Sequence, residues 1–241
     1  MKNTKHMLNL FLALFIFMGA YAQKPTEAQK EAMQRALTSA KNKVDPSAIP
    51  DKYAFSWKYS MEVKTEAGKS MTIDYFLEPN AAYYGADMNK TGAGMFLIMD
   101  TKNQLMVTSF EKAGKKTAMA SKMQDFSGIA DPKNTKYTYK SLPGKVILGF
   151  ACKGIQATSA TSTMVFYYTT EAKVSFSEIF KSQQNGGMTN AFEGFFKPGE
   201  KPLMMSMEYK DLKNKARNTT MTCVALEKKA YVFNKSDYQF M

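Results

Sequence analysis

The sequence predicts a mainly β protein, built as an antiparallel, strongly curved sheet or incomplete β-barrel. After residue 50, about ten apolar or alternating segments follow one another, separated mostly by turns too short to hold a crossover helix. The first of these segments, residues 53–64, is also long. Twelve residues of strand span about 40 Å, and long antiparallel strands tend to curl.

A secretory signal is expected at residues 1–22. Two lysines precede an apolar run at 8–18, and Ala20-Tyr21-Ala22 places small residues where signal peptidase cleaves. We therefore expect cleavage between Ala22 and Gln23 and a periplasmic or secreted protein. An uncleaved anchor is the alternative, but the run is shorter than the about 20 residues of a membrane span, and no later segment predicts one.

Residues 23–50 are expected to form an N-terminal helix and a linker. Apolar residues, mostly alanine, recur at helical spacing over 25–43, and Thr26 and Gln29 have capping-box spacing. Two prolines end the pattern. Residues 51–241 are then expected to form a single antiparallel β domain.

The β domain is expected to contain strands in a regular succession, with a short late helix at 175–183. Residues 121–144 are expected to be largely loop, because Asp-Pro and Pro-Gly pairs interrupt them. The expected strands are 53–64, 71–78, 81–88, 95–100, 104–110, 117–121, 145–158, 162–171, 203–211 and 218–229.

The first hairpin carries an unusual density of large apolar side chains at alternate positions. Each aromatic side chain buries roughly 150–250 Å², so their shared face exceeds the apolar patch that a monomer leaves exposed and must be covered. Either a packed core or a ligand cavity would cover it, and the 19 methionines of the chain suit a surface that adapts to varied partners. The residues expected to line such a cavity are Tyr53, Phe55, Trp57, Tyr59, Met61, Tyr75 and Leu77.

A Gly-rich loop at 184–200 carries Phe192, Phe195 and Phe196. These residues could act as an apolar lid over a cavity. An ordinary surface loop whose phenylalanines tuck into the core is the alternative.

Cys152 and Cys223 are the only thiols. In an oxidising compartment an even cysteine count predicts a disulfide, and two buried free thiols are the alternative.

The sequence argues against most catalytic chemistry. His6 lies in the signal and is the only histidine, which excludes Ser-His-Asp and Cys-His nucleophiles and histidine metal sites in the mature chain. Two cysteines cannot supply a four-thiolate zinc site. We therefore predict no catalytic residues, no metal and no cofactor, and an enzyme is the least favoured function.

The mature chain is basic. Without the two signal lysines it has 31 basic and 21 acidic residues, a net charge of +10. This charge indicates either an anionic envelope surface as partner or a solvated, lysine-rich surface. Nucleic acid is not expected, because arginine, the residue favoured for phosphate recognition, is nearly absent.

The segment "SLPGKVILGFACKGI", residues 141–155, followed by "MVFYYTTE", resembles a family of secreted Gram-negative envelope proteins of unknown function. Members of that family carry Lys-x-Ile-x-Gly-[Tyr/Phe]-x-Cys and then a strand that ends in Thr-Glu or Thr-Asp. Residues 95–110 look like the family's earlier hairpin, and the resemblance covers roughly 50–228. The chain departs from the pattern at Tyr167-Tyr168-Thr169-Thr170, where the family usually has an aromatic residue, one further residue and then Thr.

The order of signal, helix, long antiparallel strands and late helix is also similar to the LolA/LolB lipoprotein carriers. That resemblance implies a half-barrel with a helical lid over an apolar cavity. We therefore expect a non-catalytic periplasmic protein that binds an acyl chain, a lipid or a lipid-modified protein in the concave face of a curved sheet. The alternative is an envelope protein-interaction or structural module with a filled core and no small-molecule ligand.

Overall fold

A computed structural model describes residues 43–89, 94–123, 136–175, 196 and 200–241. The expected signal and almost all of the two expected helices lie outside these residues. Among the described residues, no helix is long and apolar enough to cross a membrane.

The described residues form twelve strands and three short 3-10 helices. The helices are η3 (Pro46–Ala48), η5 (Lys215–Arg217) and η6 (Lys235–Asp237). The strands are β1 (Lys52–Thr65), β2 (Ser70–Leu77), β3 (Tyr83–Asp87), β4 (Met95–Asp100), β5 (Leu105–Lys112), β6 (Lys115–Lys122), β7 (Thr138–Ile147), β8 (Phe150–Thr158), β9 (Ser162–Thr169), β10 (Leu203–Asp211), β11 (Thr219–Asn234) and β12 (Gln239–Phe240).

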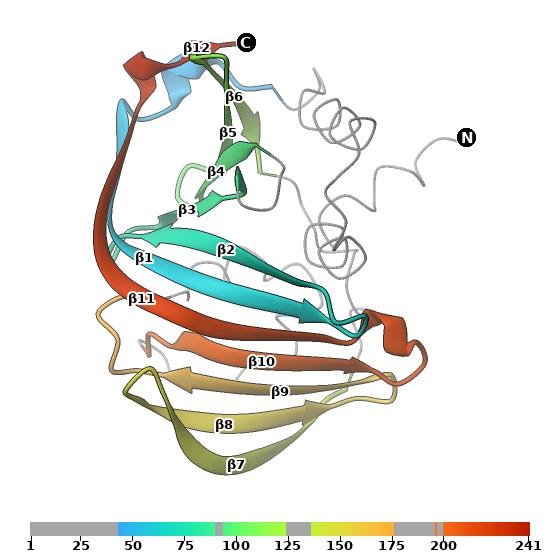
Figure 1. Cartoon of the computed structure of the whole chain (residues 1–241). Helices are drawn as coiled ribbons and strands as arrows, with labels where there is room; N and C mark the ends of the chain where they lie inside the picture. Colours follow the sequence, from blue (N-terminus) through green and yellow to red (C-terminus); the bar gives the residue numbers. More distant parts are fainter. Residues whose placement is uncertain (1–42, 90–93, 124–135, 176–195, 197–199) are drawn as a thin grey trace. The chain divides into compact units, whose positions relative to one another are not determined.

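All twelve strands belong to one sheet that is not closed, in the order β12-β6-β5-β4-β3-β2-β1-β11-β10-β9-β8-β7 (Figure 1). Two meanders, β1–β6 and β7–β11, join where β1 lies beside β11. The short β12 pairs with β6 in parallel, while β2 to β6 and β7 to β11 pair in antiparallel fashion. The prediction of a mainly β, mostly antiparallel fold is therefore confirmed.

The expected strand 145–158 instead covers the end of β7 and the whole of β8, and β7 begins at Thr138, inside the segment 121–144 that was expected to be largely loop. The chain turns at Leu148 and Gly149, which have φ angles of 50° and 82°, and thereby separates β7 from β8. Left-handed backbone is ordinary for glycine but uncommon for leucine. The sequence gives little sign of this turn, because residues 146–152 are apolar and carry Gly149 alone, whereas the usual hairpin signals are Asn-Gly or Asp-Gly.

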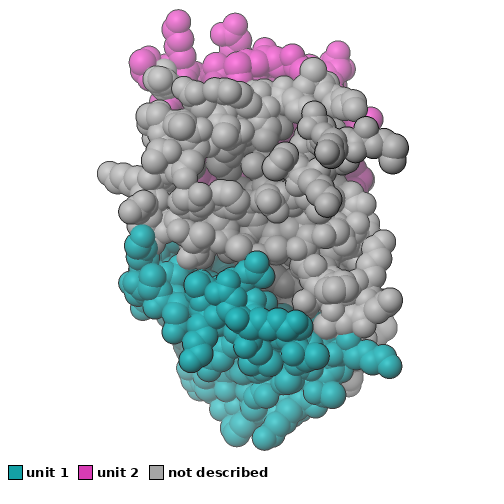
Figure 2. Space-filling view, turned by 90° about the vertical axis from the view of Figure 1, so that its right-hand side faces the viewer, with its two compact units in different colours: residues 1–22, 61–71, 125–224 teal, residues 23–60, 72–124, 225–241 magenta. Residues whose placement is uncertain are grey.

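The chain divides into two compact units. Unit 1 comprises residues 1–22, 61–71 and 125–224, and unit 2 comprises 23–60, 72–124 and 225–241. Figure 2 shows their described residues in teal and magenta. Because β1, β2 and β11 each contribute residues to both units, the sheet runs through both.

Unit 2 has an aromatic core, called the aromatic cluster below. Its rings meet mostly edge-on or tilted, as aromatic quadrupoles favour, for example Phe55 against Phe96 with ring centroids 6.3 Å apart. Tyr83, Tyr231, Tyr238 and Phe240 are partly buried against it. The aromatic cluster consists of Ile49, Tyr53, Phe55, Phe76, Phe96, Ile98, Val107, Ala118, Ala120 and Phe233.

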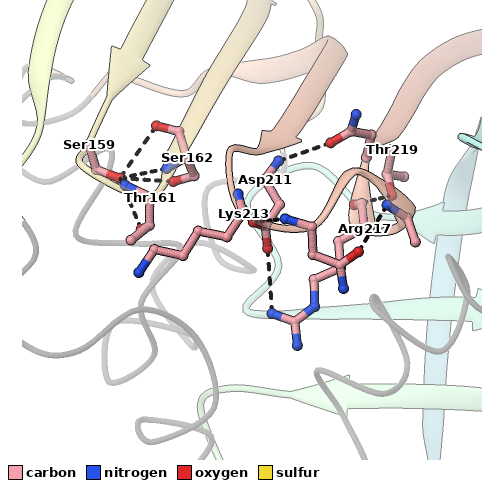
Figure 3. Close-up of polar contacts among 10 residues, drawn as sticks. Ser159, Thr161, Ser162, Asp211, Lys213, Arg217 and Thr219 are labelled. Carbon is pink, nitrogen blue, oxygen red and sulfur yellow. Dashed lines mark hydrogen bonds and ion pairs between the residues drawn. The ribbon is translucent and has the colours of Figure 1, made fainter.

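Polar turns organise one end of the unit 1 strands (Figure 3). Between β8 and β9, the Ser159 hydroxyl accepts hydrogen bonds from the backbone amides of Thr161 and Ser162. After β10, the Asp211 carboxylate accepts from two backbone amides and lies 3.5 Å from the Arg217 guanidinium. Burial opposes ionisation of Asp211, but these donors outweigh it and lower the pKa of the carboxyl. Side chains therefore fix both connections. A backbone hydrogen bond, from the Leu212 amide to the Thr161 carbonyl at 2.9 Å, links the two connections to each other.

Candidate ligand-binding face

The aromatic residues of β1 do not all lie on one face of the sheet. Phe55 packs on Phe76 with ring centroids 6.2 Å apart, whereas Tyr59 packs on Tyr75 at 6.0 Å. Tyr75 and Phe76 are consecutive residues of β2, whose pairing with β3 shows no register shift, so their side chains point to opposite faces. Phe55 and Tyr59 therefore also point to opposite faces, although strict alternation predicts the same face for both.

A hydrogen bond confirms this change of face within β1. The Ser60 hydroxyl donates to Oδ1 of Asp74 at 2.6 Å, and Asp74 lies on the same face of β2 as Phe76. Ser60 and Phe55 thus point to the same side, although one position is even and the other odd. The alternation of β1 breaks between them, in the stretch that contains the half-buried Trp57.

On one face, the predicted ligand-lining residues Tyr53 and Phe55 contact the protein's own rings. The Tyr53 ring lies edge-on to Tyr83 at 5.1 Å, and Phe55 also contacts Tyr83, at 5.5 Å, and Tyr231, at 6.1 Å. A Cβ on Gly85 would lie 2.6 Å from Phe96 Cζ and 3.3 Å from Phe55 Cζ, so the rings fill the space above this glycine. The aromatic cluster therefore occupies the face on which we expected a ligand.

On the opposite face, unit 2 carries a second apolar layer, called the methionine face below. Cross-strand register defines it, because directly paired residues share a face. One row runs Leu77, Tyr84, Met99, Met106, Ser121, and the next runs Tyr75, Ala86, Leu97, Thr108, Met119. The face also includes Tyr59, whose ring contacts Tyr75. Alternation along β2 and β4 adds Ile73 and Met95. Every one of these side chains is at most 9% exposed.

The chemistry of the methionine face is apolar and adaptable. It combines four unbranched thioether side chains with tyrosines, whose bulk is apolar and whose hydroxyls are polar. Burial raises the pKa of Tyr75 and Tyr84 well above the usual tyrosine value, so both phenols are neutral at physiological pH. The face named above contains no acidic or basic side chain.

Two hydroxyls on the methionine face lack a partner in the part of the chain that the structure describes. Thr108 Oγ1 and Ser121 Oγ are buried and make no hydrogen bond there. Most buried polar atoms in proteins are hydrogen-bonded, so two unsatisfied hydroxyls on one face are unusual.

Of the seven predicted ligand-lining residues, the structure brings Tyr59, Tyr75 and Leu77 onto the methionine face. Tyr53 and Phe55 lie in the aromatic cluster, and the buried Met61 belongs to unit 1. The sequence patterns did not identify the methionines of β4, β5 and β6 as neighbours of Tyr75. All six residues of β4 are buried, so its sequence carries no alternation that would assign faces.

The predicted lid falls mainly outside the described residues. Phe192 and Phe195 lie outside them, while Phe196 is half-buried in unit 1 with its ring edge-on to Tyr168 of β9 at 5.0 Å. The lid remains a prediction.

The predicted disulfide is not formed. Cys152 of β8 and Cys223 of β11 are buried free thiols, and β9 and β10 lie between their strands. Three strand spacings of about 4.8 Å place them about 14 Å apart, whereas a disulfide needs Cα atoms within about 7 Å. In the described ranges, no three His, Cys, Asp or Glu side chains gather as a metal site would require.

No protein-family model matches the chain, and no curated protein matches it. Solved structures with a similar trace include PNGF-II, with 12% identity and a TM-score of 0.41 over 77% of this chain and 30% of that one. An uncharacterized conserved protein from Thermus thermophilus matches with 6% identity and a TM-score of 0.39 over 76% of this chain and 82% of that one. A putative outer membrane lipoprotein-sorting protein domain from Vibrio parahaemolyticus matches with 8% identity and a TM-score of 0.21 over 73% and 85%. The chain thus spans under a third of PNGF-II, and scores below 0.5 assign neither a family nor a ligand.

Proposed function

We propose that this protein is a non-catalytic binding protein that holds an apolar ligand on the methionine face. The ligand would be an acyl chain, a lipid or a lipid-modified protein, met in the periplasm after removal of residues 1–22. The observation that carries the proposal is the methionine face itself, where Met95, Met99, Met106 and Met119 lie among buried aromatic and aliphatic side chains. Flexible thioethers suit a surface that repacks around varied apolar partners.

The other face of the same strands is a poorer candidate. Its rings contact one another in the aromatic cluster, so a ligand there would have to displace the protein's own core. We therefore propose that Tyr59, Tyr75 and Leu77 contact the ligand, whereas Tyr53 and Phe55 stabilise the fold as part of the aromatic cluster.

The finer architectural expectations belong to the same proposal. A strongly curved sheet, an N-terminal helix and a phenylalanine lid at 184–200 would give a carrier its enclosed space and its release step. The basic mature chain would favour anionic envelope surfaces.

Methionine-methyl NMR tests the proposal directly. The protein is labelled at the methionine methyl groups, and dodecanoic acid or methyl dodecanoate is added from cyclodextrin. We expect the signals of Met95, Met99, Met106 and Met119 to shift, while those of Met205 and Met221, buried in unit 1, stay. Single Met-to-Leu variants assign the signals with little change of volume.

Native mass spectrometry of protein purified from the periplasm provides the complementary measurement. A carrier should retain lipid mass above that of the bare chain. A bare mass together with unmoved methyl signals would contradict the proposal.

The second candidate function is that of an envelope protein-interaction module, and the β7–β8 hairpin is the surface that would bind the partner. Val146 is 71% exposed and Leu148 is 48% exposed at its turn, which is unusual for large apolar side chains on one short segment. Photo-crosslinking from position 146 in intact cells, with position 153 on β8 as the exposed control, would test it. A protein adduct specific to position 146, in a protein that binds no lipid, would favour this function.

A further inference from the structure

We infer that Thr108 and Ser121 form a hydrogen-bonding subsite of the methionine face, which takes an uncharged polar group of the ligand such as an ester carbonyl or an alcohol. This inference rests on the proposed function and narrows it from apolar ligands in general to acyl esters and alcohols. The observation behind it is the pair of unpartnered hydroxyls and their surroundings.

Both hydroxyls are inaccessible and unsatisfied. Thr108 is 0% exposed and Ser121 is 2% exposed, and neither side-chain oxygen makes a hydrogen bond within the described part of the chain. A hydroxyl left buried without a partner is unfavourable relative to one that is hydrogen-bonded. A bound ligand that supplies the missing partner would remove this cost.

The two hydroxyls are close enough to act on one chemical group. Thr108 of β5 pairs with Met119 of β6, and Met106 of β5 pairs with Ser121 of β6. Thr108 and Ser121 are therefore diagonal neighbours on one face, with Cα atoms about 7–8 Å apart. An oxygen atom lying between them could accept from both, because each hydroxyl rotates to donate or accept.

The surroundings favour a neutral group over a charged one. The direct cross-strand and along-strand neighbours of the two hydroxyls include Leu97, Met106 and Met119, all buried and apolar. A carboxylate or phosphate buried there would need a cation, and none of the described residues that define the methionine face is basic. Lys43, whose backbone bridges to Ser121, is itself exposed. An isolated charge is far more costly to bury than a carbonyl that two hydroxyls satisfy.

The test compares three probes of equal chain length: dodecane, methyl dodecanoate and dodecanoic acid. Each is titrated from cyclodextrin into the full-length protein, and binding is followed by the methionine-methyl signals. We expect the ester to bind about tenfold more tightly than the alkane, as one to two net hydrogen bonds would give. The Thr108→Val/Ser121→Ala variant should lose this preference and bind the ester and the alkane with about equal affinity.

Three control measurements separate the subsite from general effects. Thr65→Val removes another buried, unpartnered hydroxyl, in unit 1, and should leave all three affinities unchanged. Ser109→Ala removes the neighbouring β5 hydroxyl, which points to the opposite face and donates to the Phe96 carbonyl, and should also leave them unchanged. The double variant without ligand should melt at the same or a higher temperature than the parent, because it loses two unsatisfied hydroxyls.

The outcomes distinguish the two levels of the proposal. Equal affinity for ester and alkane, unaffected by the double variant, would overturn the subsite and leave the apolar binding face intact. Tightest binding of dodecanoic acid would overturn the preference for a neutral group. Failure of all three probes to move the methyl signals would overturn the binding function and the subsite with it.

Discussion

The Tyr53 hydroxyl donates a hydrogen bond to Oδ2 of Asp100, 3.0 Å away, at the border of the aromatic cluster. Asp100 is 2% exposed, and it also accepts from the Asn103 backbone amide at 3.0 Å and from the Asn103 side-chain amide at 2.7 Å. A buried carboxylate of β4 is thus held by a distant strand and by its own turn. Such hydrogen bonds to ionised groups are the stronger ones in proteins.

Tyr53→Phe should lower the free energy of unfolding by about 1.5–3 kcal/mol, because it leaves one oxygen of a buried carboxylate with fewer donors. Tyr83→Phe is the matched control, since its hydroxyl donates to a neutral acceptor, the Ala54 carbonyl, at 3.0 Å. We expect that control to cost about 1 kcal/mol. Denaturant unfolding followed by Trp57 fluorescence measures both, and equal losses would contradict a special role for the charged acceptor.

Gly85→Ala should destabilise the protein by about 1–3 kcal/mol, because the new methyl group would overlap the Phe96 ring at 2.6 Å. Combining it with Phe96→Leu should give a smaller loss than the sum of the two single changes, since the leucine vacates the space that the methyl needs. Thermal unfolding of the four proteins in this cycle provides the measurement. Simple additivity would show that the ring does not set the cost.

The protein should lose stability steeply above pH 10. Burial raises the pKa of Tyr75 and Tyr84, and burial together with the nearby Asp100 carboxylate raises that of Tyr53. A raised pKa in the folded state leaves stability intact below the ordinary tyrosine value and removes it as the pH rises beyond, by about 1.4 kcal/mol per tyrosine per pH unit. Tyrosinate absorbance should therefore appear in step with unfolding, and ionisation of these tyrosines in a still-folded protein would contradict the expected burial.

Both cysteines should react after unfolding without any reductant. Iodoacetamide in guanidinium chloride should add two groups to the parent chain and one to a Cys152→Ser variant, as counted by mass spectrometry. The native protein should react slowly, because Cys152 and Cys223 are 4% and 2% exposed and burial raises the pKa of the Cys152 thiol. A parent chain that takes up no group would restore the disulfide that the cysteine count predicts.

Local patterns predicted most of the strands, though not β12 or the first half of β7, because alternation and turn residues act over a few positions. The expected segments 95–100 and 203–211 coincide with β4 and β10, and 53–64 differs from β1 by one residue at each end. Which face of the sheet a side chain occupies depends also on the register between neighbouring strands, and the sequence alone does not reveal that register. The change of face between Phe55 and Ser60 is one example. The alternation of large apolar residues over 53–64 continues without a break there, so the sequence gives no sign of the change.

The candidate site was predicted only in part for the same reason. Tyr75 was selected for its place in an alternating strand, and it does lie on the methionine face. Met119 shares a face with Tyr75 only because the strands from β2 to β6 keep their register. The disulfide prediction failed because a cysteine count ignores how many strands separate the two thiols.

Among the described residues, β7 is the edge strand at one end of the sheet, and its sequence affects whether copies of this protein can pair edge to edge. The edge strand β7 changes register against β8 between Leu142 and Lys145, where Pro143 supplies no amide hydrogen. An incoming strand would find its row of donors interrupted there and an exposed lysine, Lys140, on the same strand, and both features oppose edge-to-edge pairing. The register shift and Pro143 thus make β7 a poor template for a strand from a second copy of the chain.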